Sequence, residues 1–151
     1  MAVLSGAVKA GRGKSGVSAM PKDIRAFFDG YRDAFNQLDG HAVSAHYDIP
    51  AMIAHAGGNG VFVDIEALNA NNIALCAQYA NGGFLSADFK ERTFVTQGKN
   101  FCLADLAWTI TRKDQSPQCF GTTYALSCRK GNWKVFCVTA YEEQRPWTEN
   151  D

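Results

Sequence analysis

The sequence predicts one α+β domain in which helices come first and an antiparallel meander follows. Two observations predict this order: helical spacing of apolar residues ends near residue 83, and long strand-like segments separated by turn residues take its place. The length agrees, because 151 residues suit a single domain and can bury a core without disulfides or metal. We expect the helices to cover one face of the sheet.

The first helix is predicted over residues 21–39. Its apolar side chains recur three and four residues apart and form one stripe: Ile24, Phe27, Phe28, Tyr31, Phe35 and Leu38. Asp39 and Gly40 end this helix, and Asp39 can also cap a short second helix over 41–47.

A hairpin and a third helix are predicted next. Short strands at 51–55 and 61–63 flank a glycine-rich turn, which is typical of a hairpin. Asp64 can cap a helix over 65–80, which the glycines that follow it end.

The rest of the domain reads as a meander whose strands are predicted at 84–97, 100–112, 118–129 and 133–143. Both faces of the segment 100–112 are largely apolar, whereas a meander with one solvated face alternates cleanly. We therefore expect helices to cover one sheet face and a second copy of the chain to cover the other, giving a homodimer through the sheet.

Composition excludes several classes of function. The chain has 15 basic and 15 acidic residues, which is no nucleic-acid footprint, and no apolar run of about 18 residues that would span a membrane. Residues 1–20 are rich in Gly, Ser and Ala and read as a flexible arm, 21–145 as the domain, and 146–151 as a tail. Five cysteines without a Cys-x-x-Cys pair indicate reduced thiols and a cytoplasmic protein.

Two sequence patterns that could indicate a cofactor or metal site lack the features that such a site needs. Residues 11–16 match G-x-G-x-x-G, but the flanking strand and helix that phosphate binding needs are missing. His41 and His46 stand five residues apart, the wrong spacing for one helix face. We expect no cofactor and no metal.

His55 and Asp105 are the candidates for acid–base chemistry. His55 ends an apolar strand at a glycine turn, where an imidazole at a pocket rim could exchange protons near neutral pH; the alternative is a structural, hydrogen-bonded histidine. Asp105 lies mid-strand among apolar residues, and we interpret it as a partnered acid at an interface rather than a catalytic one.

Taken together, two stretches carry a resemblance to a known family. They are residues 30–35 with Asp39-Gly40, and residues 124–127 with 131–135. With the order of elements, they resemble the nuclear-transport-factor-2-like superfamily, in its SnoaL-like and ketosteroid-isomerase-like branch, over about residues 22–144. The resemblance implies a cone-shaped, curved antiparallel sheet wrapped around three N-terminal helices.

The resemblance also implies a site. Tyr31 matches the tyrosine that donates to the developing oxyanion, His55 falls where the family holds its aspartate base, and Tyr124 falls near the family's protonated aspartate. The implied apolar cavity wall is Leu106, Trp108, Leu126, Phe136 and Val138. Because two family carboxylates are replaced, steroid isomerisation itself is not expected.

Two functions remain open on this basis. The first is a lyase or isomerase that moves a proton next to the carbonyl of a small apolar ligand, with His55 as base and two tyrosines as neutral donors. The second is a dimeric ligand-binding or assembly module without chemistry. A titrating base at position 55 separates them.

Overall fold

The computed structural model describes residues 16–141. It contains three helices, α1 (Lys22–Asn36), α2 (Gly40–Ser44) and α3 (Ile65–Asn81). The strands in this range are β1 (Gly16–Val17), β2 (Tyr47–His55), β3 (Gly58–Phe62), β4 (Phe84–Gln97), β5 (Phe101–Arg112), β6 (Gln118–Arg129) and β7 (Asn132–Tyr141).

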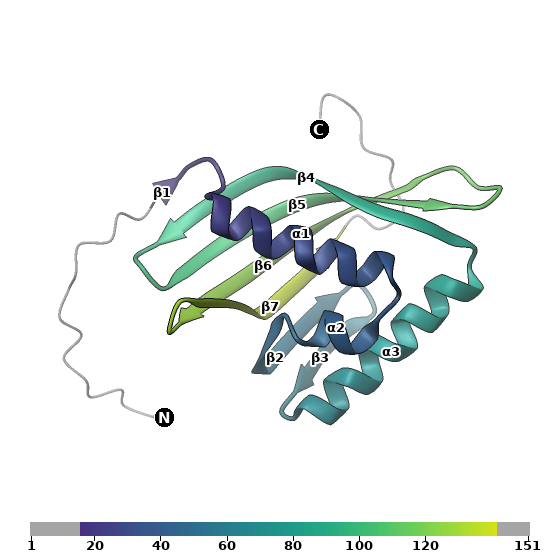
Figure 1. Cartoon of the computed structure of the whole chain (residues 1–151), viewed down its shortest axis with the longest axis horizontal. Helices are drawn as coiled ribbons and strands as arrows, with labels where there is room; N and C mark the ends of the chain where they lie inside the picture. The colour runs from purple at the N-terminus through teal and green to yellow at the C-terminus, as the bar shows by residue number, and fades with distance from the viewer. Residues whose placement is uncertain (1–15, 142–151) are drawn as a thin grey trace.

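All of these strands form one curved, unclosed sheet in the order β1-β4-β5-β6-β7-β2-β3 (Figure 1). Neighbouring strands are antiparallel except β2 and β7, which run parallel and so join the early hairpin to the last strand. The helices lie against the concave side of the sheet, with α1 across the meander β4–β7 and α3 beside the β2–β3 hairpin (Figure 1). The α+β class, the three helices and the curved sheet agree with the sequence-based prediction.

The core lies between α1 and the concave face of the sheet. Ile24 and Phe28 of the α1 stripe are almost wholly buried, and burying such side chains contributes about 1.5–3 kcal/mol each. On β5 every second residue is buried: Cys102, Ala104, Leu106, Trp108 and Ile110. Leu106 and Trp108, which the family resemblance assigned to the inward side, lie on this inner face.

The two short helix caps form as expected. The Asp39 side chain accepts a hydrogen bond from the Ala42 N–H at 3.0 Å, and the Asp64 side chain accepts one from the Ala67 N–H at 2.8 Å. Each bond satisfies a backbone donor that has no partner within its own helix.

Helices α2 and α3 pack closely against each other. A Cβ at Gly40 would lie 2.6 Å from the backbone nitrogen of Ile73, so only glycine lets the two helices approach this closely. Beside it, the buried Asn72 side chain donates to Ser44 Oγ at 2.9 Å, and Ser44 Oγ donates to the Gly40 carbonyl at 2.9 Å.

The junction between the second helix and the first hairpin strand differs from the prediction. The second helix, predicted over 41–47, ends at Ser44, and Tyr47 already belongs to β2, opposite Val135 of β7. The Val135 N–H donates to the His46 carbonyl at 2.9 Å, so pairing with a strand distant in sequence overrides the local helical pattern.

The end of the predicted arm is also structured. Gly16 and Val17 pair with Thr96 and Val95 of β4, and the Met20 N–H donates to Glu91 Oε1 at 2.9 Å. Residues 16–20 of the predicted arm thus contact β4 in the structure. Residues 1–15, with most of the G-x-G-x-x-G motif, and the predicted tail at 146–151 lie outside the described residues.

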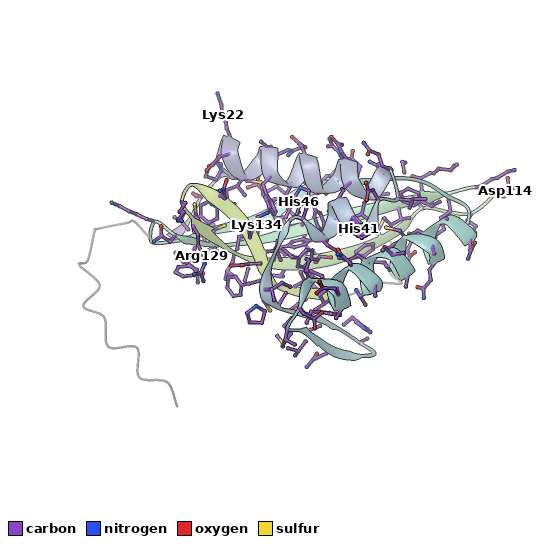
Figure 2. All side chains as sticks on the ribbon, turned by 60° about the horizontal axis from the view of Figure 1, so that its bottom comes forward. Lys22, His41, His46, Asp114, Arg129 and Lys134 are labelled. Carbon is purple, nitrogen blue, oxygen red and sulfur yellow. The ribbon has the colours of Figure 1, made fainter. Side chains whose placement is uncertain are left out.

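Of the two histidines near α2, His46 packs against the core and His41 does not. His46 Nδ1 donates to the Ala42 carbonyl at 2.8 Å, and its ring meets the edges of Phe27 and Tyr31 at centroid distances of 5.2 and 5.6 Å. Burial lowers the pKa of His46, which favours the neutral ring. His41 lies exposed on α2 (Figure 2).

Within residues 16–141, no helix combines the length and apolar character that crossing a membrane requires. Over the same range, His, Cys, Asp and Glu side chains form no cluster of three or more that could ligate a metal ion.

Candidate functional site

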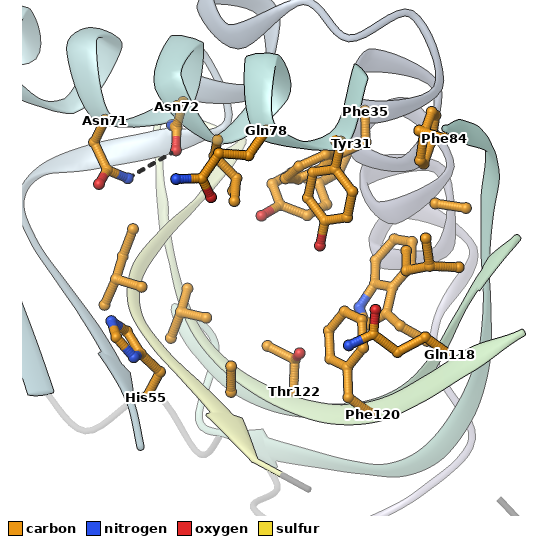
Figure 3. Close-up of a pocket in the computed structure, with 18 of the residues that line it drawn as sticks. Tyr31, Phe35, His55, Asn71, Asn72, Gln78, Phe84, Gln118, Phe120 and Thr122 are labelled. Atoms are coloured by element: carbon orange, nitrogen blue, oxygen red, sulfur yellow. Dashed lines mark hydrogen bonds between the residues drawn. The ribbon is translucent and has the colours of Figure 1, made fainter. Parts of the chain in front are cut away.

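A cavity of about 340 Å³ opens between the concave face of the sheet, α1 and α3 (Figure 3). This volume lies in the range typical of small-molecule sites, roughly 300–1,000 Å³. Much of the wall is aromatic or aliphatic, including Tyr31, Phe35, Tyr47, Ile53, Leu75, Tyr79, Phe84, Trp108, Ile110, Phe120, Tyr124 and Val138.

Three tyrosines gather at the inner wall, one each from α1, β2 and β6. Tyr31, Tyr47 and Tyr124 are 4%, 7% and 3% exposed. The Tyr31 and Tyr47 hydroxyls lie 3.0 Å apart in a hydrogen bond, and Trp108 Nε1 donates to the Tyr124 hydroxyl oxygen at 2.9 Å. The Tyr31 ring also meets the Tyr124 ring edge-on, with centroids 5.7 Å apart. We call these three residues with Trp108 the tyrosine cluster.

Burial keeps the tyrosine cluster neutral. Desolvation raises the pKa of Tyr31 well above its ordinary value, raises that of Tyr124, and raises the pKa of Tyr47 to about 12. At neutral pH each phenol therefore retains its proton and can donate one hydrogen bond.

The cluster has a donor to spare. The Trp108 indole N–H can only donate, so the Tyr124 oxygen accepts and its own O–H must point elsewhere. A chain of hydroxyls that starts at a donor-only group holds one more donor proton than it has internal links. Tyr124 also lies within hydrogen-bonding reach of the Tyr31 hydroxyl, which completes this chain, and of the Thr122 hydroxyl, which adds one link and one donor. One O–H of the group therefore has no acceptor within it, and Figure 3 shows the Tyr31 hydroxyl directed into the cavity.

His55 lies at the opposite rim, at the end of β2 (Figure 3). Its side chain is exposed, and its Nδ1 accepts a hydrogen bond from the Gly57 N–H at 3.0 Å. A neutral ring held in this way carries its proton on Nε2. To accept a proton on Nδ1, His55 must first release Gly57, so the observed ring is a hydrogen-bond donor at the rim.

The structure places the predicted site residues in three groups. Tyr31, His55, Trp108, Tyr124 and Val138 line the cavity. Leu106 and Leu126 do not: both are fully buried in the hydrophobic core on the same sheet face, away from the cavity wall.

Phe136 was wrongly assigned to the cavity. Its side chain is 36% exposed on the convex face, and its ring lies against that of Phe101 at 6.4 Å. The pairing of β6 with β7 shifts register between Ala125 and Leu126, and the bulge interrupts the alternation on which the assignment rested.

Sequence reasoning missed the polar part of the wall. Asn71 and Gln78 of α3 face the cavity, seven residues apart on one helix face, a spacing that could have signalled them. Arg112 of β5 and Gln118 of β6 also line it, as does Tyr47, which the predicted second helix concealed.

The chain matches a known protein family over nearly all of its described residues. A family model described as NTF2-like protein (DUF6841) matches residues 22–143. The chain belongs to this NTF2-like family. This agrees with the superfamily resemblance, and no curated protein matches the chain.

Solved structures share the fold of this NTF2-like protein. An NTF2-like protein of unknown function from Shewanella oneidensis aligns with a TM-score of 0.66 at 16% identity, covering 80% of this chain and 98% of its own. A ketosteroid isomerase-like protein from Erwinia carotovora atroseptica aligns with a TM-score of 0.61 at 18% identity, covering 78% and 91%. A candidate calcium/calmodulin-dependent protein kinase II association domain from Xanthomonas campestris aligns with a TM-score of 0.63 at 16% identity, covering 82% and 91%. At these identities the likeness shows the fold alone.

Proposed function

We propose that this protein binds a small apolar molecule that carries a carbonyl group, and that the carbonyl oxygen accepts a hydrogen bond from the tyrosine cluster. The observation that carries the proposal is a group of buried, neutral phenols at a largely apolar wall that holds one more O–H or N–H donor than it has internal hydrogen bonds. A hydrogen bond made away from water is stronger than one made in it, and an unmatched buried donor favours any ligand that supplies an acceptor.

The sharpest test of this proposal compares two probes of similar shape, 2-acetonaphthalene and 2-ethylnaphthalene. Removing the Tyr31 hydroxyl in Tyr31→Phe should weaken ketone binding about two- to tenfold relative to the hydrocarbon, since one neutral hydrogen bond is worth about 0.5–1.5 kcal/mol. Dissociation constants from tryptophan fluorescence or calorimetry give the ratio directly.

The matched control removes the same atom elsewhere. Tyr141 lies on the convex face, outside the cavity wall, so Tyr141→Phe should leave the ketone-to-hydrocarbon ratio unchanged. An unchanged ratio in Tyr31→Phe as well would contradict the proposed role of the cluster.

Proton transfer by His55 is the second candidate function, and the observation that favours it is that His55 lines the same cavity as the tyrosine cluster. In this scheme the His55 ring leaves Gly57, and Nδ1 takes a proton from the carbon next to the carbonyl. The C–H electron pair forms the C=C bond of an enolate, whose oxygen accepts from a tyrosine O–H. Return of the proton to another carbon gives an isomerase, and loss of a leaving group gives a lyase.

Hydrogen–deuterium exchange into the methyl group of 2-acetonaphthalene in D₂O tests this step without knowledge of the substrate. The protein should accelerate exchange over buffer, and His55→Asn should reduce the acceleration at least about tenfold, since general-base catalysis contributes roughly 10²–10⁴-fold. His41→Asn, on the exposed side of α2, should not change the rate. Exchange at the buffer rate with bound ketone would leave a binding module without chemistry.

We also propose that the convex sheet face pairs with a second copy of the chain. Phe101 and Phe136 form an exposed aromatic pair there, and Met52, opposite Val61 on the neighbouring strand, extends the apolar strip. The presence of association domains among the structural neighbours is consistent with oligomerisation.

Asp105, a carboxylate on this face, already has partners within the chain. Asp105 accepts hydrogen bonds from Thr123 Oγ1 and the Tyr141 hydroxyl and lies 3.9 Å from Arg92 Nε. Gly121 leaves room for the Tyr141 ring, because a Cβ there would lie 2.2 Å from it. A second copy could therefore cover the face without stranding an unpaired charge.

A further inference from the structure

The cavity wall carries a positive charge at the end of β5, away from the tyrosine cluster. Arg112 ends β5 and lines the cavity, and its Nη2 donates to Gln118 Oε1 at 3.1 Å. Its guanidinium also lies over the Tyr79 ring, 5.1 Å from the centroid. Figure 3 shows Gln118 on the side of the cavity opposite His55. Two neighbours thus hold the guanidinium in one orientation at the cavity wall.

Arg112 is unusual among the arginines of residues 16–141. The other four, Arg25, Arg32, Arg92 and Arg129, each lie within 4.0 Å of an aspartate side chain. Arg112 has no carboxylate at this distance among the described residues, and no Asp or Glu lines the cavity. Apart from His55, the described wall therefore carries a single formal charge, and it is positive.

We propose that Arg112, oriented by Gln118, binds a carboxylate of the ligand, so that the molecule taken up is an aromatic or aliphatic carboxylic acid. This inference rests on the proposed function, because it places the acid group at one end of the same cavity and the carbonyl at the other. A guanidinium presents two parallel N–H donors that match the two oxygens of a carboxylate, and such charge-assisted bonds are about twice as strong as neutral ones.

The distance between the two ends sets the size of the ligand. Trp108 and Arg112 lie on the same face of β5, four residues apart, which is about 13 Å of extended strand at 3.3 Å per residue. A ligand with an oxygen at each end must therefore span an apolar body of about two fused rings or a comparable chain. The side chains between them, Ile110 and Phe120, offer an apolar wall for such a body.

Arg112 could instead serve only α3. The last turn of that helix carries no basic residue, and Arg112 Nη1 lies close enough to Gly82 that a Cβ there would be 2.9 Å away. A cation at a helix C-terminus is favourable. If Arg112 serves only α3, its loss should lower the melting temperature without changing the preference of the cavity for an acid over an amide. The two roles can therefore be separated by experiment.

The test compares 2-naphthoate with 2-naphthamide, which share shape but differ in charge. The wild-type protein should bind the naphthoate about tenfold more tightly, and Arg112→Gln should abolish this preference while changing the naphthamide dissociation constant less than about twofold. Arg112→Lys should keep part of the preference, because a point charge remains without the planar fork. Arg129→Gln, which removes an exposed arginine away from the cavity, should keep all of it.

Each other outcome overturns a different statement. Equal binding of both probes by the wild-type protein would overturn the carboxylate site and leave the proposed pocket standing. Absence of binding by both would overturn the proposed function itself. A lower melting temperature in Arg112→Gln with the acid preference retained would assign Arg112 to α3 alone. Should Arg112→Gln not fold, the preference of the wild-type protein and that of Arg112→Lys still show whether Arg112 binds the carboxylate.

Discussion

Replacing Phe28 by alanine is expected to lower the free energy of unfolding by about 4 kcal/mol, since deletion of a buried phenylalanine ring costs roughly 3–5 kcal/mol. Phe28 is fully buried, and its ring packs on those of Tyr124 and Phe89, with centroids 5.0 and 6.1 Å away. The loss includes both the transfer of the ring to water and the void left in a core that can only partly collapse.

Urea unfolding at a fixed protein concentration measures this loss, with concentration held constant because assembly would shift the apparent stability. Phe27→Ala is the matched control, since Phe27 precedes Phe28 on the same helix and is only partly buried. It should cost about half as much, in proportion to the area removed from water. Equal losses in the two variants would mean that Phe28 does not anchor the core. Because Tyr124 rests on Phe28, ligand binding should weaken in Phe28→Ala and not in Phe27→Ala.

Introducing a charge at Phe101 is expected to separate the proposed dimer. Phe101 is 48% exposed beside Phe136, so Phe101→Asp should be tolerated by the monomer. At the proposed interface the same carboxylate would face its symmetry mate without a partner, which should weaken association at least about a hundredfold, given a cost of several kcal/mol for burying an unpaired charge. Sedimentation at micromolar concentration should change from about twice 16.5 kDa to one chain of 16.5 kDa.

Ile65→Glu is the control for the added charge. Ile65 is 40% exposed at the start of α3, where an acidic residue suits the helix dipole. This variant should sediment like the wild-type protein. A wild-type chain that is already monomeric at micromolar concentration would remove the proposal, and the convex face would then simply be exposed to solvent.

Local patterns were sufficient to predict the helices and the meander. The α1 stripe, the aspartate caps and the turn residues of the meander act over a few positions, and each agrees with the final fold. Tyr31 was placed at the site through the family resemblance, and its place in the stripe accounts for its buried position at the cavity wall.

Features that depend on pairing between distant segments were missed. Tyr47 enters β2 because Val135 pairs with it, and Phe136 turns outward because a bulge breaks the alternation of β7. Arg112 and Tyr79 meet only when the end of β5 folds over α3. Nothing within a few residues of these positions indicates such contacts, so the place of Arg112 in the cavity wall could not be predicted locally.

The parallel pairing of β2 with β7 has a consequence for the order of folding. During synthesis β2 emerges early, whereas its neighbour in the sheet is the last strand described, so the contact between Tyr47 and Val135 must wait for almost the whole domain. The meander β4–β7 closes through short turns and can form first, because closing long loops costs more entropy. We therefore expect the hairpin that carries His55 to dock last, so that the rim of the cavity is completed after the rest of the sheet.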